Sequence, residues 1–340
     1  MKIFPGSGTT RGRTERPRPA VALLVGSYEP ERCGVAHYCQ RLRAALEALG
    51  IPALIFTAQL PGRLLPPEAR GVVGEWDVRE RERLVRALVS YDPDIIHIQH
   101  APSSFGGRRA HLFIPQLLRL YSLRQHVVVT VHEYGGWEIG RNWPSPLRQL
   151  ATRIGALGER LGWWDRELLT LLPQSSRIIA TNASHARILG EILGPHRERL
   201  VEIPIGPNVL PLPGDPAEHR QVTRQRLGLT EDTPVLAFFG FIHPVKGIET
   251  LLAAFARLRE QHPMARLWLI GGFESLALRG EEAEAYRRTV LTRIAEHRLD
   301  EHVEITGFLP EAEVSARLFA ADLVVFPFNH GVTLKSGSLL

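Results

Sequence analysis

Short apolar runs rich in β-branched residues alternate with stretches of helical periodicity from Ala20 onward. In the first half the runs AVALLVGS, ALIFTA, IIHIQH and HVVVTVHE predict strands, and SRIIATNASHARILGEIL predicts a fifth strand that leads into a helix. Helices are expected at about residues 35–49, 79–90 and 110–124. This alternation is typical of a parallel sheet with helices on both faces.

The same alternation restarts after VEIPIGPNVLPLPGDP, residues 201–216, where the density of Pro and Gly indicates an interdomain linker. Strands are predicted at PVLAFFGF, ARLWLIGG, HVEITGF and DLVVFPF, with helices at about 247–261, 281–298 and 311–320. We therefore predict two tandem Rossmann-like, doubly wound α/β domains with a ligand cleft at the carboxyl ends of their strands. Their expected limits are 20–205 and 206–340, after a flexible basic tail at 1–19.

The second domain is expected to be incomplete. About five strands are predicted in the first domain and four in the second, and the chain ends on SGSLL, which is typical of the first turn of a helix. A further helix and strand would then follow. Without them the second sheet would have an exposed edge and its last loop would lack support, so the chain as given is expected to be poorly active.

Composition excludes several classes of protein. No apolar run approaches the roughly 18 to 20 residues of a membrane-spanning helix, and residues 1–19 lack the apolar centre of a signal peptide. Two cysteines, Cys33 and Cys39, have no partner pair, which favours the cytoplasm. The net charge of +5 is spread over 340 residues with no basic stripe or RNA-binding motif, so no nucleic-acid partner is predicted.

A loop in FFGFIHPVKGIETLL, residues 238–252, has the features of an anion site. A buried strand is predicted to end at Gly240, the loop carries His243 and Lys246, and Gly247 opens a helix. Free main-chain N–H groups at a helix start, together with an ammonium group, favour a phosphate. An ordinary β–α loop with a solvated lysine would have the same pattern.

The ending NHGVTLKSGSLL has the same features. Gly331 and Gly337 allow close approach of the backbone to a ligand, Ser338 can cap a helix or donate its hydroxyl, and Lys335 adds charge. Two such loops in one domain could hold the two phosphates of a nucleotide sugar.

In the first half, GSYEPERCGVAHYCQRL enters a helix through Gly34, where a main-chain N–H can approach a ligand, although the glycine could equally serve only to start the helix. The spaced G-x-G-x-x-G fingerprint is absent, which disfavours a dinucleotide fold of the dehydrogenase type.

The histidines do not predict a metal site. His97 and His100 lie three apart on a strand and should face opposite sides, whereas His132 ends a strand and is better placed to bind a polar ligand. DPD at 92–94 precedes its strand and is interpreted as a strand-entry signal rather than a metal motif.

A segment of the first half combines tryptophan with arginine. Its helical pattern could lie on a membrane surface or line an acceptor site, or form core with a solvated arginine face. The residues concerned are Trp137, Trp143, Arg148, Arg153, Arg160, Trp163 and Trp164.

The second half resembles the nucleotide-sugar-binding domain of family 4 retaining glycosyltransferases, which have the two-domain GT-B fold. FFGFIHPVKGIETLLAAFARL, LIGG, VEITGFLP and AADLVVFPF occur in the family's order. CGVAHYCQRL, DPDIIHIQH and TVHEY resemble its first domain, on the acceptor side, so the resemblance covers about residues 20–340.

The resemblance implies two catalytic residues: Lys246 would pair with the donor diphosphate, and His132 would lie near the donor sugar and the reaction centre. Gly34 would belong to a glycine loop facing the diphosphate. The implied donor-binding residues are Gly34, Gly240, His243, Lys246, Gly247, Gly331, Lys335, Gly337 and Ser338.

Two departures from the family pattern stand out. Many members have an arginine where this chain has Phe241, which leaves Lys246 and His243 to supply the charge. Many also have two glutamates seven residues apart on the final loop and helix, but NHGVTLKSGS contains none and the second position would fall beyond Leu340.

The resemblance implies transfer of a sugar from a nucleoside diphosphate donor to an acceptor hydroxyl with retention, without a cofactor or metal, in the cytoplasm or at the inner face of the membrane. A sugar-nucleotide epimerase or phosphorylase of the same architecture, and a non-catalytic nucleotide-sugar-binding protein or inactive truncation product, stay as alternatives. The residues do not specify the donor sugar, the base, the oligomeric state, or whether the acceptor is a glycan, a lipid or a small molecule.

Overall fold

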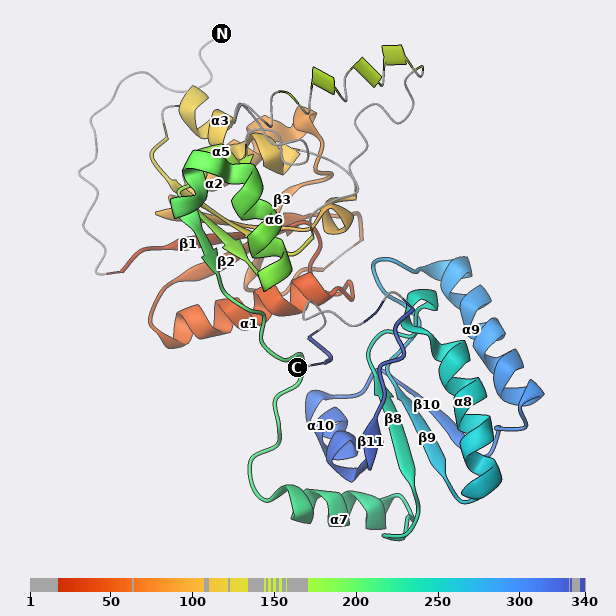
Figure 1. The fold of residues 1–340 in the computed structure, drawn as a ribbon. Helices are drawn as coiled ribbons and strands as arrows, with labels where there is room; N and C mark the ends of the chain where they lie inside the picture. Colours follow the sequence, from red (N-terminus) through yellow and green to blue (C-terminus); the bar gives the residue numbers. More distant parts are fainter. Residues whose placement is uncertain are drawn as a thin grey trace.

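The computed structural model describes residues 18–62, 64–106, 110–121, 123–133, 171–329, 331 and 337–339, and scattered residues of 144–157. Its strands form two separate parallel sheets, one in each half of the chain (Figure 1). The predicted class, two doubly wound α/β domains, is confirmed.

The first sheet has the strand order β3-β2-β1-β4-β5-β6-β7. Its strands are β1 Val21–Val25, β2 Ala53–Ala58, β3 Ala69–Val73, β4 Ile95–His100, β5 His126–Val131, β6 Arg177–Ala180 and β7 Leu200–Glu202. The α-helices described in this domain are α1 Gly34–Ala48, α2 Arg81–Tyr91, α3 Ile114–Leu120, α5 Leu171–Gln174 and α6 Ala183–Leu193.

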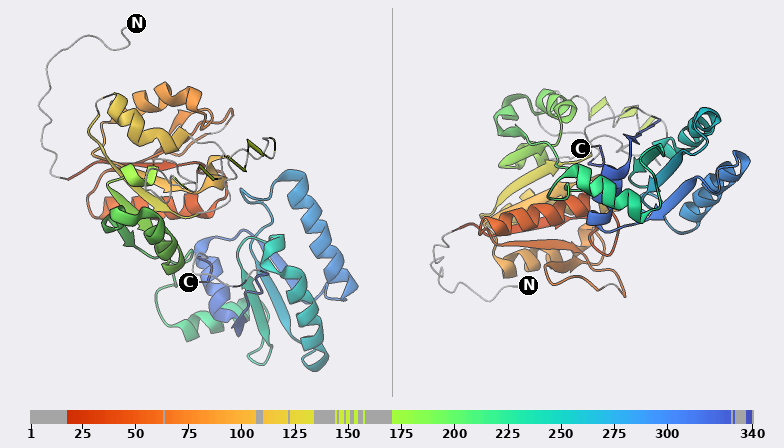
Figure 2. Two further views of the ribbon diagram at one scale, coloured as in Figure 1. Left: turned by 45° about the horizontal axis from the view of Figure 1, so that its top comes forward. Right: turned by 90° about the horizontal axis from the view of Figure 1, so that it is seen from below.

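Successive residues of β1 point into different cores, as the two-residue period of a strand requires. Leu23 packs with Cys39 of α1, whereas Leu24 packs with Leu84 and Leu88 of α2. Helices therefore cover both faces of the first sheet, and Figure 2 shows these layers from two further directions.

The second sheet has the order β10-β9-β8-β11. Its strands are β8 Val235–Phe239, β9 Arg266–Ile270, β10 Val303–Gly307 and β11 Leu323–Val324. Helices α8 Ile248–Gln261 and α9 Gly280–Glu296 cover one face, and α7 Pro216–Arg226 and α10 Glu311–Ala320 lie on the other (Figure 1).

The strand count predicted for the first domain was wrong, because the sheet has seven strands among the described residues rather than about five. The missed strands are its two edges. β3, with the sequence ARGVV, has a short apolar run, and β7 overlaps the start of the predicted linker at 201–216. Helix α7 was also missed, although Asp215 caps it and Pro216 opens it, which is a recognisable helix-start signal.

No described helix is long and apolar enough to cross a bilayer. Of the tryptophan and arginine segment, only Arg153 belongs to the described residues. Most of the predicted basic tail, residues 1–17, also lies outside them.

Candidate functional site

The two domains meet where the loop before α1 touches the segments that follow β9 and β10. The N–H of Leu276 donates to the carbonyl of Arg32 at 3.0 Å, and Glu31 forms a 3.1 Å ion pair with Arg279. The Arg32 guanidinium lies 3.6 Å from the centroid of the Phe308 ring, a cation–π geometry. The amino end of α1 is thereby held beside the carboxyl edge of the second sheet.

Helix α1 begins with its main-chain donors uncovered by side chains. Cys33, its N-cap residue, makes no side-chain capping bond, and the first turn has no acidic residue. A Cβ built on Gly34 would meet nothing within 4 Å. The positive end of this helix dipole is thus open at the domain interface.

His132 follows β5 at the carboxyl edge of the first sheet. Its Nε2 lies 3.0 Å from Oε1 of Gln99, its N–H donates to the carbonyl of His100, and its ring meets that of Tyr38 edge-on at 4.7 Å. Burial, followed by two neighbouring histidines, lowers the pKa of His132 to about 3. The imidazole is therefore neutral at physiological pH and acts as a hydrogen-bonding group, not as a cation.

His97 and His100 have different partners, as expected for opposite faces of a strand. Nε2 of His97 lies 2.8 Å from Oγ1 of Thr130, and Nδ1 of His100 lies 3.1 Å from Nε2 of His111. No group of three or more potential metal ligands occurs among the described residues.

The strand-entry interpretation of DPD is confirmed. Asp92 ends α2 in a left-handed conformation, and Asp94 accepts a hydrogen bond from the N–H of Ala20 at 2.8 Å.

The first loop of the second domain is crowded with backbone contacts that only glycine tolerates. A Cβ on Gly271, at φ +143°, would lie 2.0 Å from the carbonyl oxygen of Gly240. A Cβ on Gly247, at φ +71°, would lie 2.0 Å from the carbonyl oxygen of Pro327. Gly247 is also the N-cap of α8, so the start of that helix faces the loop that follows β11.

The loops after β8 and β11 are locked together. The side-chain amide of Asn329 donates to the carbonyl of Pro244 at 2.9 Å, and its N–H donates to the carbonyl of Val245 at 3.1 Å. Nζ of Lys246 lies 3.9 Å from the centroid of the Phe328 ring. The cation and the helix start are therefore part of one two-loop structure, as the sequence predicted.

His243 does not supply the additional charge expected of it. Burial and the nearby Lys246 ammonium both lower the pKa of His243 below its ordinary value. Its imidazole accepts from the N–H of Val245 at 3.4 Å and starts a short 3₁₀ turn. The expected contribution was wrong because two cations this close repel each other, so Lys246 is the charged residue of this loop.

The last described residues close onto the first loop and the linker. The carbonyl of buried Gly337 accepts from the N–H of Asn208 at 2.7 Å. A Cβ on Gly240 would lie 3.3 Å from Oγ of Ser338. Residues 337–339 form a turn rather than the expected helical turn, because the contact with the linker sets their conformation. Lys335 lies outside the described residues.

Gly331 is exposed and left-handed at φ +78°, and its N–H donates to the carbonyl of Phe328 at 3.1 Å. It belongs to the loop that carries Asn329, so it is held close to the first loop through that residue.

Family models match both halves of the chain. Residues 33–209 match the model described as Glycosyltransferase Family 4, and residues 219–332 match Glycosyl transferases group 1. The chain belongs to glycosyltransferase family 4. The predicted family is thereby confirmed.

Curated relatives agree with this assignment. The chain is 28% identical over 308 residues to the D-inositol 3-phosphate glycosyltransferase of Nocardia farcinica, covering 86% of this chain and 64% of that protein. It is 31% identical over 282 residues to the enzyme of the same name from Geodermatophilus obscurus, covering 75% and 58%. The chain therefore spans about three fifths of the length of these relatives.

Solved structures with the same architecture show that the fold is GT-B. Sucrose-phosphate synthase from Thermosynechococcus elongatus aligns with a TM-score of 0.60 at 20% identity, covering 92% of this chain and 76% of that one. HepE of Anabaena in complex with UDP-glucose aligns with a TM-score of 0.52 at 19% identity, covering 90% and 73%.

One departure of this family 4 chain now has a structural setting. Phe241, which stands where many members have arginine, packs edge-on against Phe308 with ring centroids 5.8 Å apart. Arg32 lies over that same Phe308 ring. An aromatic cluster that carries a cation from the first domain therefore occupies this part of the interface.

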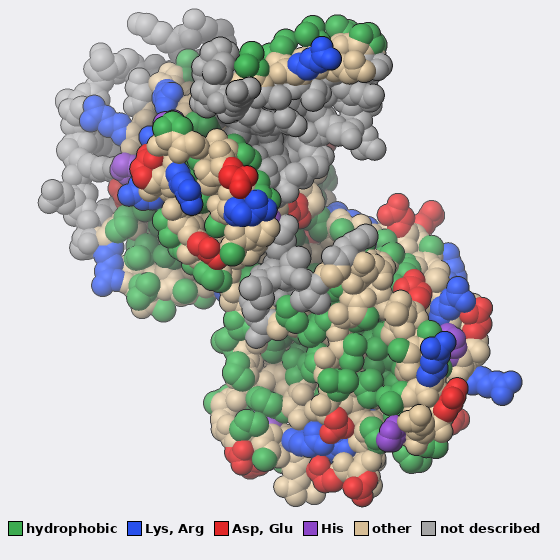
Figure 3. Space-filling view, in the orientation of Figure 1, with side chains coloured by type: hydrophobic (Ala, Val, Ile, Leu, Met, Phe, Trp, Pro, Cys, Tyr) green, Lys and Arg blue, Asp and Glu red, His purple; other side chains and the backbone are tan. Residues whose placement is uncertain are grey.

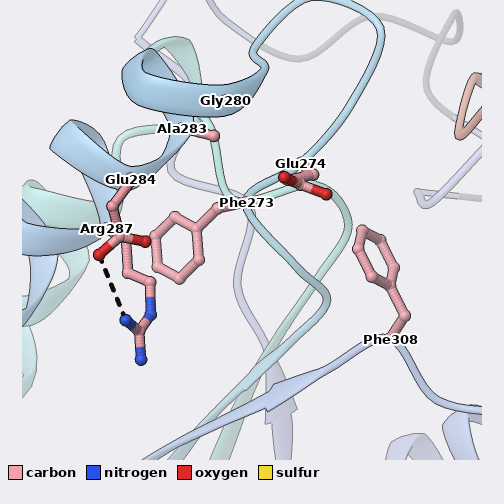
Figure 4. Close-up of a pocket in the computed structure, with 7 residues that line it drawn as sticks. All are labelled: Phe273, Glu274, Gly280, Ala283, Glu284, Arg287 and Phe308. Atoms are coloured by element: carbon pink, nitrogen blue, oxygen red, sulfur yellow. Dashed lines mark hydrogen bonds and ion pairs between the residues drawn. The ribbon is translucent and has the colours of Figure 1, made fainter.

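A cavity of about 250 Å³ opens beside this cluster (Figure 4). Phe273 and Phe308 lie on either side of it, Ala283 of α9 contributes apolar surface, and Glu284 pairs with Arg287 at 3.4 Å. The sequence analysis missed this cavity, although both phenylalanines directly follow glycines at strand ends, in GGF and TGF.

Proposed function

We propose that this protein transfers a sugar from a nucleoside diphosphate donor to an acceptor hydroxyl with retention of anomeric configuration. One observation carries the proposal: the Lys246 and Gly247 loop of the second domain, locked to the loop after β11, lies in a two-domain fold whose other half opens a helix start at Gly34. Membership of glycosyltransferase family 4 and the UDP-glucose complex of HepE support it.

Each loop would have a distinct part in the reaction. The departing diphosphate develops charge that Lys246 and the N–H groups at the starts of α8 and α1 can stabilise. Gly240, with the other donor-binding residues predicted above, would keep the backbone close enough to the phosphates. The donor set predicted from the sequence is Gly34, Gly240, His243, Lys246, Gly247, Gly331, Lys335, Gly337 and Ser338.

His132 would serve the sugar rather than the phosphates. Its imidazole is neutral because burial lowers its pKa to about 3, so it exchanges hydrogen bonds with hydroxyl groups without adding charge. We propose further that the cavity between Phe273 and Phe308 takes the donor base, because apolar surface with charged groups at its border suits a flat heterocycle.

The decisive experiment has a binding arm and a product arm. Calorimetry of the 340-residue chain with UDP, ADP and GDP should show binding of at least one, and Lys246→Ala should weaken it at least tenfold. Product analysis with anomerically defined, labelled donors should show net transfer with retention. Binding of none of the three diphosphates contradicts the proposal. Isomerised donor would favour an epimerase, phosphorolysis a phosphorylase, and binding without turnover a non-catalytic protein.

We also propose a peripheral contact with an anionic membrane surface. Leu147, Leu150, Ile154 and Leu157, spaced three, four and three residues apart, are 51–55% exposed, and their described neighbours are helical. Figure 3 shows hydrophobic and basic atoms together on the segment that projects at the upper right. An apolar helix stripe with nearby arginines, here Arg153, matches the chemistry of anionic headgroups over acyl chains.

Flotation with phosphatidylglycerol and phosphatidylcholine vesicles tests this contact. The chain should bind the anionic vesicles, and the double variant Leu150→Asp, Ile154→Asp should lose at least tenfold in binding. Leu64→Asp, at a leucine that is 91% exposed in the β2–β3 connection, is the matched control and should bind normally. Equal loss in both variants, or no binding to anionic vesicles, overturns the proposal.

A further inference from the structure

Gln99 is a buried polar side chain beside the candidate reaction centre. It lies near the end of β4, is 0% exposed, and pairs in register with Thr130 of β5. Its Oε1 lies 3.0 Å from Nε2 of His132, and its own Nε2 has no partner among the described residues. A buried amide that satisfies one neighbour and leaves a donor unpaired costs free energy, so its retention needs a reason.

The contact determines which nitrogen of His132 carries the proton. A carbonyl oxygen can only accept a hydrogen bond, so Nε2 of His132 must donate. In a neutral imidazole the other nitrogen, Nδ1, then carries a lone pair. His132 is half-buried, so the ring keeps some surface open.

A second restraint holds the ring plane. Tyr38 of α1 meets His132 at an interplanar angle of 75°, and its hydroxyl is hydrogen-bonded to Thr130, which in turn contacts His97. Tyr38 lies one helical turn after Gly34. The imidazole is therefore clamped between β4 and the helix whose start faces the second domain.

We propose that Gln99 is a positioning residue that holds His132 in the Nε2–H tautomer, so that Nδ1 accepts a hydrogen bond from a hydroxyl group of the sugar substrate. This inference rests on the proposed function. With the opposite tautomer, Nδ1–H would face the same hydroxyl as a donor, and the hydroxyl would have to turn its own proton elsewhere.

The groups around His132 do not themselves introduce charge at neutral pH. They are His97 and His100 from β4, Tyr38 from α1 and His185 from α6, and Glu133 follows His132 in the chain. Burial lowers the pKa of His97 to about 4 and that of His100 to about 3, and raises that of Tyr38. A new charge at position 99 would therefore act on His132 against a neutral background.

Two substitutions at Gln99 test the inference on the full chain. Gln99→Leu removes the acceptor at similar volume and should lower kcat at least tenfold with little change in donor KM. Gln99→Glu should retain the tautomer but raise the pKa of His132. Activity should then fall as pH decreases, because protonated Nδ1 no longer accepts, whereas the unsubstituted protein should be flat over that range.

The matched control is Thr57→Val, which removes another fully buried hydroxyl, on β2, without changing side-chain shape. It should leave kcat and its pH profile unchanged. A loss in Thr57→Val equal to that in Gln99→Leu would assign the effect to general disturbance of the sheet and would contradict positioning.

A spectroscopic readout separates this inference from the proposed function. Nitrogen-15 NMR of labelled histidine, assigned with His132→Gln, should show protonated Nε2 and unprotonated Nδ1 at position 132, with or without turnover. An Nδ1–H tautomer in the unsubstituted protein, or a flat pH profile in folded Gln99→Glu, overturns the inference. Absence of transfer together with the expected tautomer would count against the proposed function alone.

Discussion

The carboxyl edges of the two sheets have the same topology but different chemistry. In the first sheet, neutral side chains such as Gln99, Thr130 and His132 line consecutive strand ends and bind one another. In the second, glycines bring main chains into contact around a single cation, Lys246. Parallel sheets expose free backbone groups at this edge in both cases, so side-chain size and charge decide what each edge can bind. The first edge suits hydroxyl groups and the second suits phosphates.

The glycines show the same contrast in their surroundings. Gly247 and Gly271 have no room for a methyl group, whereas Gly34 is open to solvent. Crowded glycines hold a rigid loop in place, while an open glycine at a helix start leaves space for a ligand.

Removing the cation should have the largest effect on this comparison. We expect Lys246→Ala to reduce transfer by about 10²- to 10³-fold, because charge on the leaving diphosphate would lose its main partner. The measurement is kcat/KM for a labelled donor. Arg288→Ala, an exposed cation on α9, is the control and should retain the rate. Unchanged transfer in Lys246→Ala would refute the role of the second edge as the phosphate side.

Backbone crowding in the second edge can be tested by stability alone. Gly271→Ala should lower the free energy of unfolding by roughly 3 kcal/mol, through a left-handed φ and a clash with the Gly240 carbonyl. Gly280→Ala has a left-handed φ but nothing within 4 Å, so about 1 kcal/mol is expected. Urea unfolding of the two variants separates strain from clash, and equal losses would mean that the close approach relaxes at no cost.

Acid should destabilise the first edge. Burial depresses the pKa of His97 to about 4 and those of His100 and His132 to about 3, against about 6.5 in the unfolded chain. Below pH 6.5 the unfolded state binds protons that the folded state does not, so stability is full above that pH and falls as pH decreases toward 4. The expected slope is about 1 kcal/mol per histidine per pH unit.

Urea midpoints at several pH values measure this slope. His97→Gln should flatten it by the share of one histidine. A slope that does not change with that substitution would show that other groups titrate in this range.

Chelation should have the smallest effect. We expect excess chelator to leave transfer unchanged, because Lys246 and helix-start N–H groups would stabilise the diphosphate without a metal ion. Loss of activity that returns with added Mg²⁺ would show that the second edge needs a further cation.

Several features of both edges could be predicted from the sequence, because they depend on local order. The strand-loop-helix pattern placed Lys246 and Gly247 at a helix start and His132 at a strand end, and the structure has both there. Edge strands β3 and β7 were missed because they have short or partly exposed apolar runs. The charge expected of His243 was wrong, because the sequence does not reveal how close its imidazole lies to the lysine ammonium.

The sequence by itself determined the alternation of elements, the division into two α/β units and the family, because these follow from periodicity and from motifs in a set order. Only the tertiary structure decided that Gln99 meets His132, that Phe328 lies under Lys246 and that Asn208 of the linker joins Gly337. Those pairs depend on strand register and loop packing between distant segments. Such contacts arise from the balance of burial and backbone hydrogen bonding over the whole chain, which no local pattern records.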